Sequence, residues 1–242
     1  MTLADAIIHA RAGEQEGFAC LYEYTVPHIW LAAAMLGCPK HGTAVTQIYR
    51  NAQQSVSFLH SPSDLRVWMG KIAYGVLLQQ PENSGREIPC LTGALRDVYG
   101  MMRELPRQER IALLMLCGEG CSAPQAADIL SVPDIEIKRA MRRARQTIAE
   151  QLKQKGSEEI CNTAWLIAQL ADLRTAQSEA DAKAQENILH CVCTGEDYVE
   201  PEEPVAVPQT DTSVEKETEQ GQAKPEEKSG FFHKLFRSRR FG

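Results

Sequence analysis

The chain has 242 residues and a formal net charge of -6, with 43% hydrophobic, 24% charged and 6% aromatic residues. This length allows one or two compact domains, and the shortage of aromatic and strand-favouring residues argues against a β-sandwich or β-barrel. No apolar run approaches the ~18 residues of a transmembrane helix, and the N-terminus lacks the features of a secretory signal. We therefore expect an all-α, cytoplasmic protein whose eight cysteines are reduced thiols.

Apolar residues at helical spacing predict a first small helical domain over residues 1–80. Its expected helices cover residues 3–12, 16–36, 43–58 and 65–80. Pro27 either opens a new helix or kinks a long one. Ser61-Pro62-Ser63-Asp64 is a turn and N-cap signal before the fourth helix, and a linker is expected at residues 81–90.

A second small helical domain is predicted over residues 91–155. The pattern indicates helices over residues 91–104, 107–118, 122–130 and 134–154. Ser122 suits the N-cap of the third helix, with Pro124 in its first turn, and Ser131-Val132-Pro133 forms a three-residue turn before the fourth. This order, a short helix, a tight turn and a longer helix, is that of a helix-turn-helix.

The helix predicted over 134–154 combines an apolar stripe with basic residues. At about 100° per residue, the stripe that we expect to be buried contains Ile137, Met141, Ala144, Ile148 and Leu152. Residues 134–155 carry seven basic and three acidic groups, and most of the basic groups fall off the stripe. A basic second helix with this register is suited to the major groove of DNA.

The predicted DNA-binding residues are Ile135, Glu136, Lys138, Arg139, Arg142, Arg143 and Arg145. Two other interpretations stay open. In the first, the arginines only make an exposed helix face soluble and bind nothing. In the second, they contact DNA phosphates alone, which would position the protein on DNA without recognising a base sequence. A third class of function is an interaction protein whose arginine-rich helix packs on an acidic partner.

The stretch ELPRQERIALLML (104–116) precedes the helix-turn-helix, and Ile137-Lys138 and Arg143-Ala144-Arg145 follow in its second helix. Together they resemble region four of bacterial sigma factors of the extracytoplasmic-function group. ARAGEQEGFACLYEYTVPHIW (10–30) and LRVWMGKIAYGVLL (65–78) resemble helices of region two in the same family. The resemblance covers residues 4–155.

The resemblance implies a protein that is not an enzyme, needs no cofactor, and binds core RNA polymerase and promoter double-stranded DNA. Residues 134–145 would enter the upstream promoter element, and Val45, Thr46 and Gln47 would contact polymerase. An anti-sigma protein is a further candidate partner.

The chain also departs from the family. In the family, the helix that corresponds to 43–56 begins with clustered acids and binds a coiled coil of polymerase, but here it has no acid. On the next helix, few cations remain for phosphate contacts, chiefly Arg66 and Lys71. Ser131 stands where the family has a turn glycine, so the turn is strained if φ is positive there. The alternative function is therefore a degenerate sigma paralogue that binds DNA or polymerase without opening promoters.

The C-terminal part divides into three predicted segments. Residues 156–193 form a helical extension, with one amphipathic helix over 158–192 whose apolar face carries Ile160, Ala164, Ile167, Ala168 and Ala171. Residues 194–230 form an acidic, disordered linker, with three basic and eleven acidic groups over 196–228. Residues 231–242 form a basic aromatic tail, which suits an anionic membrane or an acidic partner, or only balances the linker charge.

Other candidate sites are weaker. His190, Cys191 and Cys193 supply three soft ligand atoms, but a single C-x-C lacks the second pair of a structural zinc site, so ordinary thiols are the simpler interpretation. Cys117 and Cys121 suit small core positions. We expect no metal and find no catalytic constellation.

Overall fold

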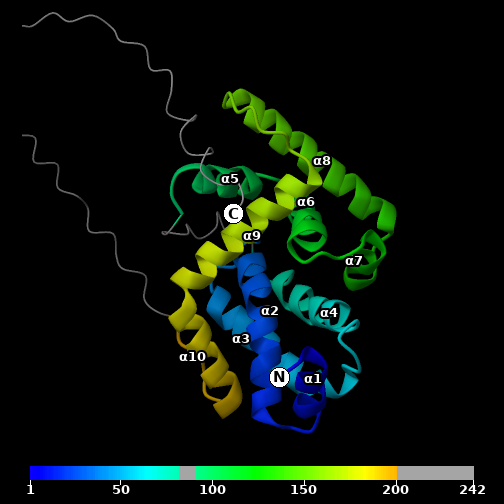
Figure 1. Cartoon of the computed structure of the whole chain (residues 1–242), viewed down its shortest axis with the longest axis vertical. Helices are drawn as coiled ribbons and strands as arrows, with labels where there is room; N and C mark the ends of the chain where they lie inside the picture. Colours follow the sequence, from blue (N-terminus) through cyan, green and yellow to red (C-terminus); the bar gives the residue numbers. More distant parts are fainter. Residues whose placement is uncertain (82–90, 201–242) are drawn as a thin grey trace, which may run out of the picture. The chain divides into compact units, whose positions relative to one another are not determined.

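The computed structural model describes residues 1–81 and 91–200, and every element within these ranges is helical, which confirms the all-α fold (Figure 1). The predicted linker, the acidic segment from residue 201 and the basic aromatic tail lie outside the described residues. In the first 155 residues the helices follow the predicted order. They are α1 (Leu3–Arg11), α2 (Gln15–Met35), α3 (His41–Ser55), α4 (Leu65–Leu77), α5 (Gly93–Arg103), α6 (Arg107–Leu113), α7 (Ala123–Leu130) and α8 (Asp134–Gln154), with a short 3₁₀ turn η1 (Val56–Phe58) and a π-helical turn η2 (Leu114–Gly118).

Helix α2 is continuous through Pro27 and runs through the core. Every residue from Ile29 to Leu36 is buried, whereas a surface helix keeps one face in water. The reason is that α2 is contacted from several sides, by α1, α3 and the C-terminal helices. Trp30 is almost fully buried, as expected of a core anchor.

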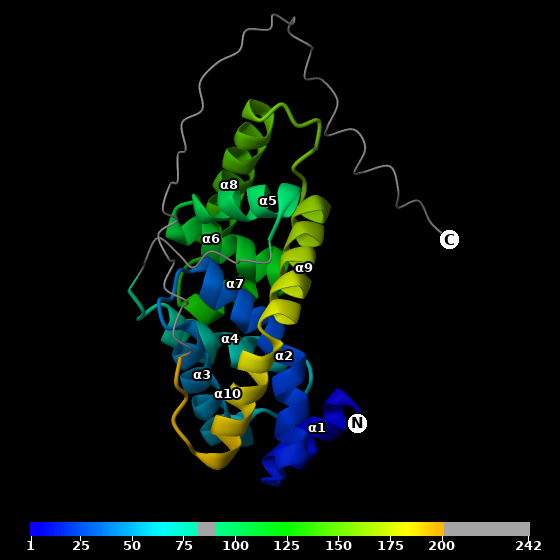
Figure 2. The same cartoon turned by 90° about the vertical axis from the view of Figure 1, so that its left-hand side faces the viewer.

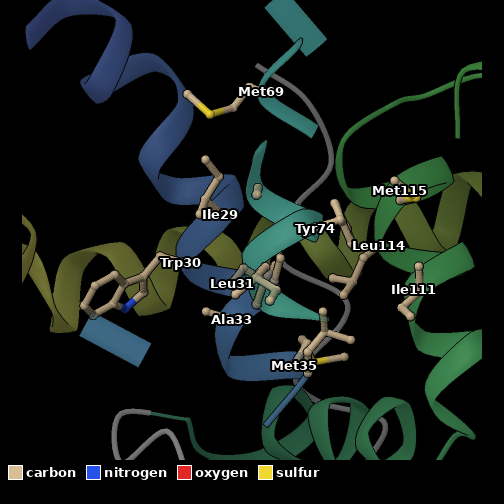
Figure 3. Packing of buried hydrophobic residues seen from close by; sticks show 14 of the residues in the cluster. Ile29, Trp30, Leu31, Ala33, Met35, Met69, Tyr74, Ile111, Leu114 and Met115 are labelled. Atoms are coloured by element: carbon tan, nitrogen blue, oxygen red, sulfur yellow. The ribbon is translucent and has the colours of Figure 1, made fainter. Parts of the chain in front are cut away.

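The two groups of helices predicted as separate domains share one buried apolar cluster (Figure 3). Helix α4 packs on α7 so closely that a Cβ atom at Gly70 would lie 2.7 Å from Cδ1 of Ile129. An ion pair of 3.0 Å joins Lys71 Nζ to Asp128 Oδ2 beside this contact. The described residues, 1–81 and 91–200, accordingly belong to one compact unit.

Two arginines of the second group bind the carboxyl ends of helices in the first group. Arg103 donates from Nη1 to the carbonyls of Ala34 (2.9 Å) and Met35 (2.8 Å) at the end of α2. Arg107 donates from Nη2 to the carbonyls of Leu77, Leu78 and Gln80 at the end of α4. Cations at these positions satisfy carbonyls that have no partner within the helix and complement the negative end of its dipole.

The prediction of one helix over 158–192 is wrong, because the extension contains two helices, α9 (Thr163–Ala180) and α10 (Ala182–Thr194). Asn162 begins α9 by accepting a 2.9 Å hydrogen bond from the Trp165 amide. Asp181 separates the helices, and its carboxylate accepts a 2.8 Å hydrogen bond from Nε1 of Trp30. The break is therefore fixed by a tertiary contact with α2.

The predicted apolar face of the extension is also wrong. Ile160 is 75% exposed and Ile167 is 47% exposed, and Ala164 and Ala168 are exposed as well. The buried side of α9 instead carries Leu166, Leu170, Leu173 and Gln177. Leucines bury more apolar area than alanines, so the leucine row decides which face packs inward.

The expected disorder is corrected for residues 194–200. Helix α10 lies beside α3 (Figures 1 and 2), and the segment after it stays in contact with the same helix. The Thr43 amide donates to Oε1 of Glu200 (2.8 Å), and Arg50 forms an ion pair with Asp197 (3.3 Å).

Candidate nucleic-acid interface

The short helix α7 begins as the sequence predicts. Ser122 and Gln125 form a reciprocal capping box, in which the Gln125 amide donates to Ser122 Oγ (3.3 Å) and the Ser122 amide donates to Gln125 Oε1 (2.9 Å). Pro124 lies in the first turn. Two of the amides that a helix start leaves unpaired are thereby satisfied.

The turn between α7 and α8 requires a left-handed residue. Ser131 has φ 55° and ψ 42°, and it is the one non-glycine residue with positive φ in the described parts of the chain. The amides of Ser131 and Val132 donate to the Ala127 carbonyl and close the end of α7. The predicted strain is thus present, at a cost of about 1–2 kcal/mol relative to glycine.

The predicted buried stripe of α8 is confirmed. Ile137, Ala144, Ile148 and Leu152 are buried, and Met141 is half-buried at the edge of the stripe. Ala140, which the sequence analysis did not include, is buried too. These residues pack against α6 and α7, so the opposite side of α8 faces solvent.

All seven predicted DNA-binding residues lie on the exposed side of α8. At about 100° per residue, Ile135, Arg139 and Arg142 occupy the middle of the exposed arc. Lys138 and Arg145 lie toward one edge of the arc, and Glu136 and Arg143 lie toward the other. Ile135 is 47% exposed, which adds an apolar side chain to the cationic surface.

Two of the basic residues are held by acidic neighbours. Lys138 forms an i,i+4 ion pair of 2.6 Å with Asp134 and lowers the pKa of that carboxyl. Arg143 donates from Nε to Glu109 Oε1 at 2.9 Å. Among the described residues, no hydrogen bond or ion pair engages Arg139 or Arg142, so both guanidinium groups can reach a ligand.

Glu109, which the sequence analysis did not single out, forms an ion pair with one of the predicted DNA-binding residues. It lies on α6, is only 6% exposed, and fixes the orientation of Arg143. Its partner is 34 positions away in the chain, so no local spacing reveals the pair. The available signal in the sequence was weak, because the stretch ELPRQERIALLML holds two acids, Glu104 and Glu109, beside two arginines.

The predicted polymerase contacts are mostly inaccessible. Val45 (0% exposed) and Thr46 (3% exposed) are buried, and the Thr46 hydroxyl donates to the Gly42 carbonyl at 2.8 Å. Gln47 is exposed and donates to Asn51 Oδ1 at 2.7 Å. In this fold only Gln47 of the three is available to a partner, because the other two fill the space between α3 and its neighbours.

The cations of α4 are already engaged by the helix-turn-helix half of the protein. Arg66 donates from Nη1 to the Gly120 carbonyl at 3.0 Å, and Lys71 pairs with Asp128. These are the residues that the sequence analysis left for phosphate contacts. In this arrangement they hold α4 against the segment that contains α7.

A cavity of about 330 Å³ lies between α2, α4 and the turn before α7. Its lining includes His28, Arg66 and Glu119. Burial raises the pKa of Glu119 to about 7, and burial, aided by nearby Arg174, lowers the pKa of His28 to about 4. His28 is therefore neutral in the folded protein near pH 7, whereas Glu119 titrates in that range.

The described residues contain no group of three or more His, Cys, Asp or Glu side chains that could hold a metal ion. The seven described cysteines are free, and Cys117 and Cys121 are buried core residues as predicted. In the same part of the chain, no helix has both the length and the apolarity needed to cross a membrane.

Comparison with known families supports the helix-turn-helix directly. Residues 95–148 match the sequence model of the family described as Sigma-70, region 4. The matched range begins in α5 and ends at Ile148 of α8, so it contains both helices of the motif and the cationic face. Neither the curated proteins nor the solved structures gave a match.

Proposed function

We propose that this chain is a sigma-factor-like protein that binds core RNA polymerase and recognises promoter DNA through α8. The observation that carries the proposal is an exposed face centred on Arg139 and Arg142, on the second helix of a helix-turn-helix within the matched segment. Residues 1–80 would serve as its region two, on the sequence resemblance described above. An anti-sigma partner stays a prediction.

The geometry suggests how α8 would bind DNA. In a helix-turn-helix the second helix lies in the major groove while the first crosses the phosphate backbone. Arg139 and Arg142, near the start of α8, would then face the base edges, where a guanidinium can bind guanine O6 and N7 through two hydrogen bonds. The ion pair with Glu109 already restricts the Arg143 side chain, so Arg143 would lose less conformational entropy on binding DNA. It therefore suits a contact to a phosphate at a fixed position.

The proposal is tested by transcription with purified core RNA polymerase. Duplex DNA that the chain enriches from a random pool would be placed upstream of a reporter segment. We expect transcripts that start at a defined position and require the chain. If the chain binds neither polymerase nor any selected DNA, the proposal is wrong.

A second candidate function is that of a regulator which binds DNA or polymerase without opening promoters. The observation in its favour is that Arg66 and Lys71 are both occupied by Gly120 and Asp128, which leaves α4 few cations for a DNA strand. The same experiment separates the two functions. A regulator would bind polymerase and the selected DNA but would give no chain-dependent transcript.

A further inference from the structure

The cavity between α2, α4 and the turn before α7 is larger than a packing defect. Its volume is about 330 Å³, whereas the voids inside a well-packed domain rarely exceed one water molecule. Small-molecule sites usually have volumes of about 300–1,000 Å³. The space exists because α2 and α4 both pack on α3 but scarcely on each other. Two of the residues that line it, Ala32 and Ala73, have side chains too small to fill it.

One part of the cavity wall is aliphatic. Ile29 of α2 and Met69 of α4 line the cavity from facing helices (Figure 3). Leu65 at the start of α4 and the half-buried Leu3 of α1 belong to the same lining. Tyr24 also lines the cavity, but it is 61% exposed, so most of its ring lies in solvent. Branched and flexible aliphatic side chains adapt to an alkyl chain better than to a flat ring system.

The polar part of the wall contains a cation that no acid neutralises. Arg66 is exposed and donates from Nη1 to the Gly120 carbonyl at 3.0 Å. Among the described residues, no carboxylate forms an ion pair with Arg66, so its remaining N–H groups are available to a ligand. Lys71 on the same helix differs, because it is paired with Asp128 and does not line the cavity.

His28 and Glu119 line the cavity beside this cation. Both ring nitrogens of the neutral His28 are engaged, Nδ1 by the Gly118 carbonyl (3.2 Å) and Nε2 by Nη1 of Arg174 (3.3 Å). Glu119 Oε1 accepts a hydrogen bond from the Tyr74 hydroxyl. No described residue engages Glu119 Oε2 through a hydrogen bond or an ion pair. When the carboxyl group is protonated, this side of it can donate a hydrogen bond to an anion.

The charge of the wall selects the class of ligand. Arg66 would repel a cationic head group, and the described residues offer no group of acids, histidines and cysteines for a metal ion. A nucleotide would need several donors for its phosphates, whereas the lining has one arginine and no lysine. A carboxylate fits, because a guanidinium can bind its two oxygens through two charge-assisted hydrogen bonds.

We propose that this cavity is a binding site for a small aliphatic monocarboxylate, with the head group on Arg66 and the alkyl chain between Ile29, Leu65 and Met69. The wall contains residues of both halves of the protein, so a bound ligand would stabilise their packing. The site is separate from the exposed face of α8, and the proposal does not depend on the proposed function.

The test uses three probes that share an alkyl chain and differ in charge, namely octanoate, octanol and octylammonium. Each is titrated into the full chain and followed by the NMR signals of the side-chain methyl groups of Ile29 and Met69. The methyl groups of Ile148, which is buried on α8 and does not line the cavity, are the internal control. We expect octanoate to shift only the first two sets of signals and to bind about tenfold more tightly than octylammonium.

Three variants locate the two ends of the ligand. Arg66→Gln should weaken octanoate binding about tenfold and leave octanol binding unchanged. Lys71→Gln is the matched control, because it removes the other cation of α4, and it should change neither affinity. Ala73→Met places a flexible side chain in the cavity and should weaken the binding of both probes.

The pH dependence of binding is an independent measurement. Between pH 6 and 8 arginine stays protonated. The pKa of His28 is about 4, that of Cys121 is about 12, and that of Tyr74 is raised well above its usual value, so Glu119 is the group around the head that titrates. Ionised Glu119 repels a carboxylate, so octanoate should bind up to about tenfold more weakly at pH 8 than at pH 6. Glu119→Gln should remove this difference.

Several results would overturn the proposal. Equal affinity for octanoate and octylammonium, or equal octanoate affinity of the Arg66→Gln and Lys71→Gln variants, would exclude an anionic head on Arg66. Equal octanoate affinity of the wild type at both pH values would exclude a head beside Glu119. Equal shifts at Ile148 and Met69, or no shift with octanoate at several millimolar, would exclude a site in the cavity. The comparison of Arg66→Gln with Lys71→Gln decides the proposal even if Ala73→Met does not fold.

Discussion

The phenol of Tyr74 on α4 donates a 2.7 Å hydrogen bond to Glu119 Oε1, in the turn that leads to α7. This contact joins the two halves that the sequence divides into separate domains. Burial raises the pKa of Glu119 from its usual 4.5 to about 7, although the Tyr74 hydrogen bond and nearby Arg66 oppose the shift. The interface between the halves therefore contains a carboxyl group that titrates near neutral pH.

We predict that Glu119 makes the free energy of unfolding fall as the pH rises between about 4.5 and 7. In this range the folded state binds a proton that the unfolded state has lost, so raising the pH favours unfolding. Glu119→Gln should remove this slope and stabilise the protein at about pH 8 by about 2–3 kcal/mol. Chemical denaturation of both proteins at several pH values measures the slope.

Tyr74→Phe is the matched variant for this measurement. It removes the hydrogen bond that favours the ionised carboxylate, so the pKa of Glu119 should rise further. An identical pH dependence in the wild type and in Glu119→Gln would show that this carboxyl is not the titrating group.

Arg142→Ala and Arg139→Ala should weaken DNA binding without affecting the melting temperature. Both side chains are exposed, and neither has a partner among the described residues. A phosphate contact should lower the slope of log affinity against log salt by about one, whereas a contact to a guanine base should cost about 1–3 kcal/mol and relax specificity. Binding isotherms at several salt concentrations distinguish the two.

Arg11→Ala is the control for these substitutions, because Arg11 is an exposed arginine on α1. Lys138→Ala should also weaken binding, by a smaller amount since Asp134 already neutralises part of its charge. If the Arg139, Arg142 and Arg11 variants all bind DNA equally well, α8 is not the DNA-binding helix. An arginine-rich helix that only packs on an acidic protein would give this result.

Ile148→Asp should prevent folding of the helix-turn-helix half. Ile148 is 0% exposed, and an unpaired carboxylate there costs several kcal/mol or forces a large rise in its pKa. Ile148→Ala should cost about 2–5 kcal/mol, and Met141→Ala less, because Met141 is only half-buried. Thermal melts of the full chain test this order, and a larger loss for Met141→Ala would mean that α8 is rotated.

The packing of α4 on α7 predicts a specific coupling between Gly70 and Ile129. Gly70→Ala should destabilise the protein by about 1 kcal/mol, because the new methyl group meets Cδ1 of Ile129 at 2.7 Å. Ile129→Val removes that methyl group, so the double variant should lose less stability than the sum of the single variants. Simple additivity of the three free energies of unfolding would contradict a contact between the two halves.

The helix-turn-helix could be predicted from sequence because its signals are local. Ser122 and Pro124 mark the start of α7, and the apolar stripe from Ile137 to Leu152 fixes the orientation of α8 with no information from the rest of the chain. Glu109 illustrates the limit of this approach. Its role depends on the packing of α6 against α8, which no spacing along the chain encodes.

The extension could not be predicted because tertiary contacts override its periodicity. The break at Asp181 depends on the hydrogen bond from Trp30, and α3 packs against α10 of the extension as well as against α2 and α4. Residues 194–200 have the acidic composition of a disordered linker, but Glu200 and Asp197 find partners on α3. Composition predicts how a segment behaves in isolation. In the folded protein, contacts with α3 decide the structure of residues 194–200.

The most direct test of the central claim is the sequence of the DNA that the chain selects. A random duplex pool would be enriched with the full chain bound to core RNA polymerase, and in parallel with the Arg139→Ala/Arg142→Ala variant. The account predicts one recurring sequence for the wild type and loss of preference within that sequence for the variant. Enrichment of no sequence, or of the same sequence to the same extent by both proteins, would contradict recognition of DNA by α8.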